Sequence, residues 1–373
     1  QPRENDLVLG THGRSVYILD DYSALRGLNE SALQQRLDIL SVTPGQQYIP
    51  SVSPSTRFTG SGEFRADNEP YGVMVTFVAS GEDLPHPDPE AERERSARQR
   101  ADKAQAADED NAESKPAKVA LTVRNAAGEI VRRQKFEVNQ GINRIAWGMR
   151  HDGVRPPPGP EPAKLEDGLP DGPEVPPGEY RIELELPTPG GETATATSQV
   201  SVLPDPRSSV SPQGRLSKYE SLLALQTLEE AAVTAVERIT HARRDTETVI
   251  DLIRQRQQPG AELEGSFKAL NDQAVELREG LDELEKRFRT PPGTKGIVYD
   301  EDKVMNQIGL AQYYVGSGSG APTATAAIYV DLATRSLREA EAAVDRVMST
   351  DLTGFRNSVA AAGIGLFGSA TKP

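Results

Sequence analysis

Cysteine is absent from this chain of 373 residues. Disulfides, thiolate catalysis and zinc sites built from cysteine are therefore excluded. The sequence also lacks any run of about 18 apolar residues, so we expect no membrane span. No stretch combines the basic, apolar and small-residue parts of a signal peptide. None of these absences fixes a cellular compartment.

Positive charge is in the minority. The chain has 42 lysines and arginines against 56 aspartates and glutamates, which gives a formal net charge of −14. Nucleic acids and anionic membranes bind proteins through a concentrated positive surface. No run of lysine and arginine provides one, so we expect no nucleic-acid partner.

Histidine is scarce, and the four histidines stand far apart in the sequence, at His12, His86, His151 and His241. None lies within four residues of another, so the spacing of a zinc-binding His-Glu-x-x-His motif is missing. The sequence therefore predicts no metal site, and nothing in it indicates a cofactor.

Three other patterns approach a catalytic or phosphate-binding motif and fail. The Gly-x-Ser-x-Gly nucleophile motif needs serine where Gly318 stands. Residues 363–368 fit Gly-x-Gly-x-x-Gly, but they follow a helical pattern rather than a strand. Adjacent Asp20 and Asp21 should point to opposite sides of a strand end, unlike the facing carboxylates of a glycosidase. We therefore predict no catalytic residue within this chain.

The first residues carry the signal of a β-hairpin. Residues 6–9 and 15–20 are rich in β-forming residues, and Gly10 and Gly13 supply the turn. A two-stranded hairpin is marginal in water, so these strands need further partners. Residues 29–69 show no period and are rich in Ser, Pro, Gly and Gln, which predicts an extended connector lying along a surface.

Between residues 70 and 204 apolar and polar residues alternate, as is typical of strands. Short strands separated by turns predict a β-sandwich of immunoglobulin or fibronectin type, with Trp147 in its core. A charged insertion at 82–117 is expected to be a solvated helix or disordered. A proline-rich insertion at 154–177 is expected to be an extended loop. The candidate strands are 72–79, 118–125, 129–138, 142–149, 178–186 and 193–203.

From residue 205 to 373 the period becomes helical. Apolar residues at alternating threes and fours mark 225–253 and 263–288, and Pro259–Gly260 separates the two runs. This pattern predicts an antiparallel helical hairpin with a coiled-coil-like seam. Further helices are expected over 301–315, after Pro322–Thr323 and over 351–362, and one antiparallel bundle would bury all their apolar stripes.

The order of several short motifs resembles a known family. Residues 6–25, which contain Leu-Gly-Thr-His-Gly-Arg-Ser-Val-Tyr-Ile-Leu-Asp-Asp, resemble the closing stretch of the β-propeller in bacterial BNR (Asp-box) repeat proteins related to sortilin. Such proteins are often labelled glycosyl-hydrolase-like. The later motifs follow in the family's order: Gly141–Trp147, Pro177–Tyr180, Asp205–Arg207 and Pro322–Thr323. The chain departs from the family at Gly148, where aspartate is common, and in the insertion 82–117.

The resemblance implies a multidomain β plus α chain: terminal propeller strands, an immunoglobulin-like sandwich and an antiparallel helical bundle. Residues 1–28 would be the last strands of a truncated propeller, whose N-terminal remainder would be this chain's partner. His12 and Arg14 would lie at the propeller rim and are the candidate binding residues. The resemblance also implies an extracytoplasmic location, periplasmic or secreted.

Three functions stay open. The leading one is a non-catalytic C-terminal accessory or interaction region, with a protein or glycan as its partner. A second is a part of a glycoside hydrolase or related hydrolase whose active site lies in the propeller. The third is a structural assembly module, because such sandwiches resemble the immunoglobulin-like part of flagellar hook-capping proteins and the 263–288 seam could pair between chains.

Overall fold

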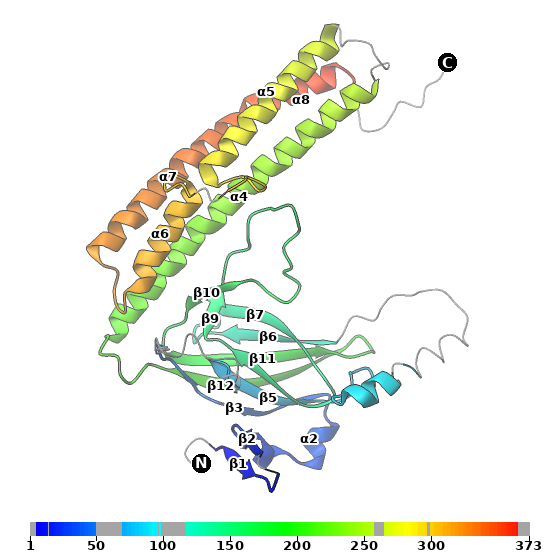
Figure 1. The fold of residues 1–373 in the computed structure, drawn as a ribbon, viewed down its shortest axis with the longest axis vertical. Coiled ribbons are helices and arrows are strands. Elements are labelled where there is room, and N and C mark those ends of the chain that lie inside the picture. The colour runs from blue at the N-terminus through cyan, green and yellow to red at the C-terminus, as the bar shows by residue number, and fades with distance from the viewer. Residues whose placement is uncertain are drawn as a thin grey trace. The chain divides into compact units, whose positions relative to one another are not determined.

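The structure, a computed structural model, describes residues 5–13, 15–49, 69–95, 97, 117–256, 265–296 and 299–364. It confirms a mixed β and α chain with several sheets and a C-terminal helical region. The chain divides into two units. The sheet unit holds residues 1–153 and 165–209, and the helical unit holds residues 154–164 and 210–373 (Figure 1).

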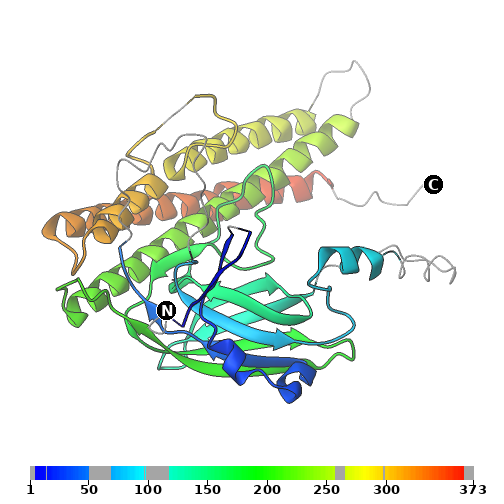
Figure 2. The same ribbon diagram turned by 60° about the horizontal axis from the view of Figure 1, so that its bottom comes forward.

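The larger sheet of the sheet unit has five strands in the order β4-β12-β11-β6-β7 (Figure 2). All its neighbouring strands are antiparallel except β4 and β12, which are parallel. In β6 every second residue is buried, so one face of this sheet lies on a core. The strands are β4 Gly45–Gln46, β6 Lys118–Arg124, β7 Ile130–Glu137, β11 Gly178–Pro187 and β12 Thr193–Leu203.

A second sheet has three antiparallel strands in the order β3-β5-β8. They are β3 Leu37–Val42, β5 Val73–Ala79 and β8 Gly141–Trp147. All seven residues of β5 are buried, so this strand is covered on both faces. Trp147 is 1% exposed, and its ring meets Tyr180 of β11 edge to face at 5.2 Å. This contact joins the two sheets and confirms Trp147 as a core residue.

The predicted connector over 29–69 is wrong at residues 37–42 and 45–46, which form β3 and β4. Pairing with β5 buries Leu37 and orders a stretch whose sequence shows little period. Two short helices precede it, α1 Ala24–Gly27 and α2 Glu30–Gln34. The side chain of Asn29 caps α2 by accepting a hydrogen bond from Ala32 N at 3.0 Å. Residues 50–68 of the predicted connector lie outside the described residues.

The strand predicted over 142–149 ends early, because Met149 adopts a left-handed backbone with φ of 54°. The chain turns there into β9 Arg150–Asp152, which pairs with β10 Asp171–Glu174. The prediction of an extended loop over 154–177 is therefore wrong at residues 171–174, which form β10. Of the insertion 82–117, residues 89–95 are helical, and residues 96 and 98–116 lie outside the described residues.

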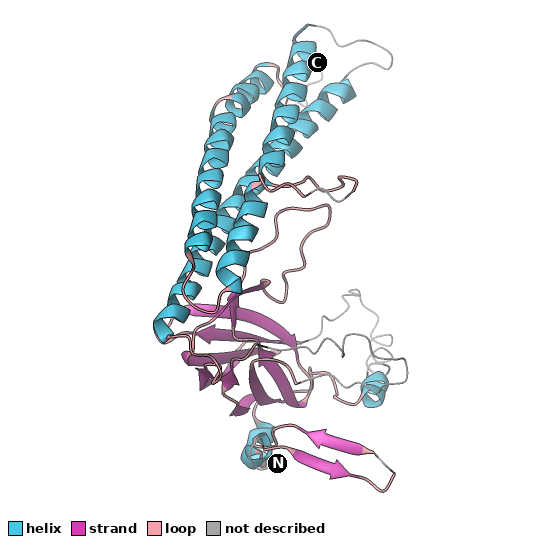
Figure 3. Ribbon diagram, turned by 60° about the vertical axis from the view of Figure 1, so that its left-hand side comes forward, coloured by secondary structure: helices cyan, strands magenta, loops and turns pink. Residues whose placement is uncertain are grey.

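The helical unit contains five helices in the described residues (Figure 3). Their apolar stripes meet in one core that includes Ile239, Leu281, Phe288, Val315 and Val344. The helices predicted over 225–253, 263–288, 301–315 and 351–362 are all present, and Thr323 caps the helix predicted after Pro322. Their bounds are α4 Pro212–Arg256, α5 Gly265–Phe288, α6 Val304–Ser317, α7 Ala324–Ser349 and α8 Asp351–Ala361.

One charged side chain lies inside this core. Glu285 of α5 is 1% exposed and is ion-paired with Arg289 at 2.7 Å and with Arg243 of α4. Burial opposes ionisation, but the hydrogen bonds from Arg243 and Arg289 prevail and hold the pKa of Glu285 below its ordinary value. The buried ion pair between Glu285 and Arg243 thus fixes α5 against α4.

We expect Glu285→Gln to lower the free energy of unfolding by about 3 kcal/mol at neutral pH, because it leaves two arginines without their buried counter-charge. Since the folded pKa of Glu285 lies below the unfolded one, its contribution is complete above the unfolded pKa and is lost as the pH falls through the folded pKa. The difference between variant and wild type should therefore shrink in acid. Urea denaturation at neutral and acid pH measures both effects.

The control is Glu283→Gln, in the same helix, whose side chain is 71% exposed and paired with the exposed Lys286. This change should leave the unfolding free energy nearly the same. Equal losses from the two substitutions would contradict a special role for the buried pair.

Candidate functional site: the β1–β2 hairpin

The predicted hairpin is present, with β1 Leu7–Gly10 antiparallel to β2 Val16–Leu19. Among the described residues it is a two-stranded sheet with no third strand (Figure 3). All eight of its residues are exposed. Seven are large and apolar, with exposed fractions of 42 to 65%: Leu7, Val8, Leu9, Val16, Tyr17, Ile18 and Leu19.

Both faces of the hairpin are apolar. Paired residues share a face, so Leu7, Leu9, Tyr17 and Leu19 lie on one side, while Val8, Val16 and Ile18 lie on the other. A strand with one face in water alternates apolar and polar residues, whereas a strand that is apolar throughout is normally covered on both faces. An exposed apolar surface of this kind marks an interaction site.

An arginine of the three-stranded sheet anchors the base of the hairpin. Arg144 of β8 donates from Nη1 to the Asp20 carbonyl at 2.8 Å and from Nη2 to the Asp21 carbonyl at 3.0 Å. Its Nε donates to Thr76 Oγ1 of β5 at 3.2 Å. Asp21 has a left-handed backbone with φ of 44°, which presents its carbonyl to the arginine in a strained conformation. Arg144 thereby connects the hairpin to the three-stranded sheet.

Carboxylates surround this arginine. Asp6 Oδ1 accepts a hydrogen bond from Asp21 N at 3.2 Å and closes the hairpin at its open end. Burial raises the pKa of Glu69, and the negative charges of Asp20, Asp6 and Asp21 add to the effect, while Arg144 opposes it. The base is therefore rich in negative charge, and Arg144 offsets part of it.

The two candidate binding residues fall at the tip of the hairpin. His12 is exposed in the turn between the strands. The turn is closed by a hydrogen bond of 2.9 Å from Thr11 N to the Ser15 carbonyl. Arg14 lies outside the described residues. His12 thus lies on the hairpin that carries the apolar faces, at the opposite end of β1 from the base of the hairpin.

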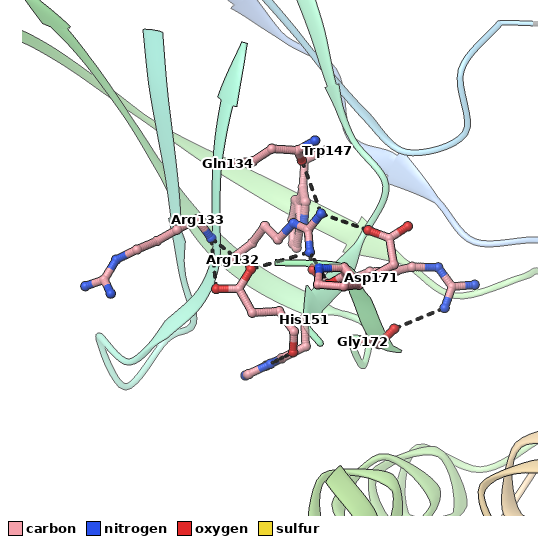
Figure 4. A network of polar contacts seen from close by, with 10 residues as sticks. Arg132, Arg133, Gln134, Trp147, His151, Asp171 and Gly172 are labelled. Carbon is pink, nitrogen blue, oxygen red and sulfur yellow. Dashed lines mark hydrogen bonds and ion pairs between the residues drawn. The ribbon is translucent and has the colours of Figure 1, made fainter. Parts of the chain in front are cut away.

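A second polar cluster, which the sequence did not indicate, centres on Arg132 of β7 (Figure 4). Its side chain is 6% exposed, and it is ion-paired with Asp152 of β9 at 3.4 Å and with Asp171 of β10 at 2.8 Å. Nη1 also donates to the Pro170 carbonyl at 2.9 Å. Burial raises the pKa of Asp152, while hydrogen bonding by the Arg133 backbone and the charge of Arg132 lower it. The cluster ties β7, β9 and β10 together.

Arg132 and Arg133 are adjacent in a strand, so their side chains face opposite sides. The sequence gives no sign of which of the two arginines is the buried one. The donors of Arg132 are used by oxygens of Asp152, Pro170 and Asp171. We interpret this cluster as a structural clamp of the sheet unit rather than a binding site.

The other histidines are dispersed: His86 and His241 are exposed, and the ring Nδ1 of His151 lies 2.9 Å from the Asp152 carbonyl oxygen. Within the described residues, no group of three or more His, Asp and Glu side chains could hold a metal ion. A search of the same residues finds no helix with the length and apolar character needed to cross a membrane.

Comparison with protein-family models, with curated proteins and with solved structures found no match to this chain.

We expect Arg144→Ala to loosen the base of the hairpin, because two charge-assisted hydrogen bonds to backbone carbonyls are lost. Amide hydrogen exchange at Asp21 and Tyr22, whose N–H groups bond to Asp6 and Asn5 across the base, should accelerate about tenfold or more. Arg133→Ala, which removes an exposed arginine side chain from β7, serves as the control. Unchanged exchange at both amides in Arg144→Ala would contradict the anchoring role.

Proposed function

We propose that this chain is a non-catalytic interaction region of a BNR-repeat β-propeller protein related to sortilin, and that hairpin β1–β2 completes a blade of the propeller. The observation that carries the proposal is the hairpin itself, whose seven large apolar side chains are exposed on both faces. The resemblance of residues 6–25 to the closing stretch of such a propeller supplies the kind of partner.

The backbone of the hairpin fits this role. In a two-stranded sheet the outer edge of each strand has unpaired N–H and C=O groups, which can accept another strand. Addition of strands would satisfy these groups, and stacking between neighbouring sheets would cover both apolar faces. In a propeller each blade is a four-stranded sheet packed between two others. Two strands of one blade would thus need two more strands and two covering blades.

The remaining parts of the proposal follow the resemblance. The two sheets joined by Trp147 and Tyr180 are inferred to be an immunoglobulin-like β-sandwich, since most of their strands are antiparallel. An extracytoplasmic location is proposed on the resemblance alone. The described residues offer no observation that favours a hydrolase, so we do not propose an activity for His12.

The proposal is tested by hydrogen exchange of the hairpin amides in this chain alone and in the presence of the propeller domain, placed N-terminal to it in one polypeptide. We expect the amides of β1 and β2 to exchange rapidly in the chain alone, because a two-stranded hairpin is marginal in water. Beside the propeller they should become strongly protected, because pairing with further strands removes them from water. Val8→Lys with Ile18→Lys should abolish that protection by placing charges on a buried face.

A matched pair of substitutions at exposed strand positions, Thr195→Lys with Thr197→Lys in β12, should leave the protection intact. Hairpin amides that exchange equally fast with and without the propeller would overturn the proposal. So would an encoded polypeptide in which no Asp-box repeats precede the hairpin.

A further inference from the structure

A cavity of about 320 Å³ lies in the helical unit, between the last turn of α5, the segment 300–303 and the middle of α7. Val304, the first residue of α6, and Ala340 of α7 are 2% and 5% exposed and form the apolar part of its lining. Small-molecule sites commonly have volumes of about 300–1,000 Å³. The cavity therefore has room for a molecule of the size of an amino acid.

The 263–288 seam, which on sequence grounds could pair between chains, is not open to a ligand or a partner. Leu270, Leu277, Leu281 and Leu284 of this seam are buried in the core of the unit. The cavity instead takes its α5 residues, Lys286 and Arg287, from the exposed side of that helix.

Most of the cavity lining is charged. Sites for apolar ligands are lined mainly by apolar side chains, and covering charged groups with an apolar molecule costs free energy. The lining thus favours a charged ligand. Three basic and three acidic residues share it with Ser336: Lys286, Arg287, Lys303, Asp300, Asp302 and Glu339.

Some of these charges are neutralised within the protein. Nζ of Lys303 lies 3.3 Å from Oδ2 of Asp300 and donates to the Lys286 carbonyl at 3.0 Å, and the Lys303 side chain is 12% exposed. Lys286 itself is paired with Glu283 at 2.6 Å. Lys303 thereby connects the segment before α6 to the end of α5 and holds two walls of the cavity together.

Three other lining charges are not neutralised in this way. Arg287 of α5, Asp302 before α6 and Glu339 of α7 are exposed, and their side chains form no ion pair or hydrogen bond within the part of the chain that the structure describes. The half-buried hydroxyl of Ser336 also lacks a hydrogen-bond partner among these residues. The cavity therefore presents one positive and two negative charges, on three different segments, together with a hydroxyl group.

We propose that this cavity binds a basic amino acid, whose carboxylate pairs with Arg287 and whose two cationic groups pair with Asp302 and Glu339. Lysine has one negative and two positive charges near neutral pH, so its charges match the three unpaired ones in number and in sign. Arginine suits a carboxylate because it can donate two parallel hydrogen bonds to it. Ser336 offers a further hydrogen bond to the ligand.

Other small ligands fit these charges less well. An acidic amino acid would place its second carboxylate against Asp302 or Glu339, and a diamine would leave Arg287 without a counter-charge. The net charge of −14 also attracts a ligand of net positive charge to the chain. The proposal concerns the helical unit and goes beyond the propeller role of the hairpin.

Isothermal titration calorimetry of the full chain with L-lysine tests the proposal. We expect saturable binding, and we expect Arg287→Gln and Glu339→Gln each to raise the dissociation constant about tenfold or more, because each removes one ion pair with the ligand. Cadaverine, which is lysine without its carboxylate, should bind the wild type more weakly than lysine does. Its binding should weaken further in Glu339→Gln but not in Arg287→Gln.

Arg244→Gln in α4 and Glu276→Gln in α5 are the matched controls, because both residues are exposed and neither lines the cavity. They should leave the dissociation constant for lysine unchanged. All four substitutions are at exposed positions and should leave the thermal unfolding temperature nearly the same, so a loss of binding reports on the cavity rather than on folding. The hairpin pair Val8→Lys with Ile18→Lys should bind lysine as the wild type does, which separates this proposal from the propeller role.

No binding of L-lysine at millimolar concentration would overturn the proposal. So would lysine binding that is the same in the wild type, Arg287→Gln and Glu339→Gln, or cadaverine binding as tight as that of lysine.

Discussion

Burial of β5 on both faces is the constraint on which the sheet unit depends. This strand pairs with β3 on one edge and β8 on the other, so it holds the segments 37–42 and 141–147 in one sheet. From β8, Trp147 reaches the five-stranded sheet and Arg144 reaches the hairpin. A strand of seven residues thereby determines where the second sheet, the sheet-to-sheet contact and the hairpin base all lie.

Much of this architecture follows from hydrophobic periodicity. The helices around Leu281 and Val344 and the strands around Leu121 and Ile182 have regular apolar spacing, and the structure places them where that spacing predicts. Periodicity does not predict structure where contacts with other segments, or an unusual backbone conformation, determine it. Residues 37–42 become a strand because β5 offers an edge, and the strand of Trp147 ends because Met149 takes a backbone conformation that its side chain does not signal.

The candidate sites divide in the same way. The hairpin could be predicted because its apolar residues are contiguous and its turn contains glycine. Its arginine anchor could not, because Arg144 acts on backbone carbonyls of residues more than a hundred positions away. The buried position of Arg132 depends likewise on β9 and β10, and both of these strands are short and polar in sequence. Long-range contacts to backbone atoms leave no pattern in the sequence of either partner.

Helix α4 has a consequence for how the helical unit unfolds. With 45 residues it extends for about 68 Å as a regular helix. Its first half contacts α6, where Lys218 donates to the Gly316 carbonyl and Gln312 donates to Glu229, and its second half contacts α5 through Arg243. Neither α5 nor α6 can leave without exposing part of the same rod. Helices α5 and α6 therefore share one packing partner, and the loss of either exposes part of α4.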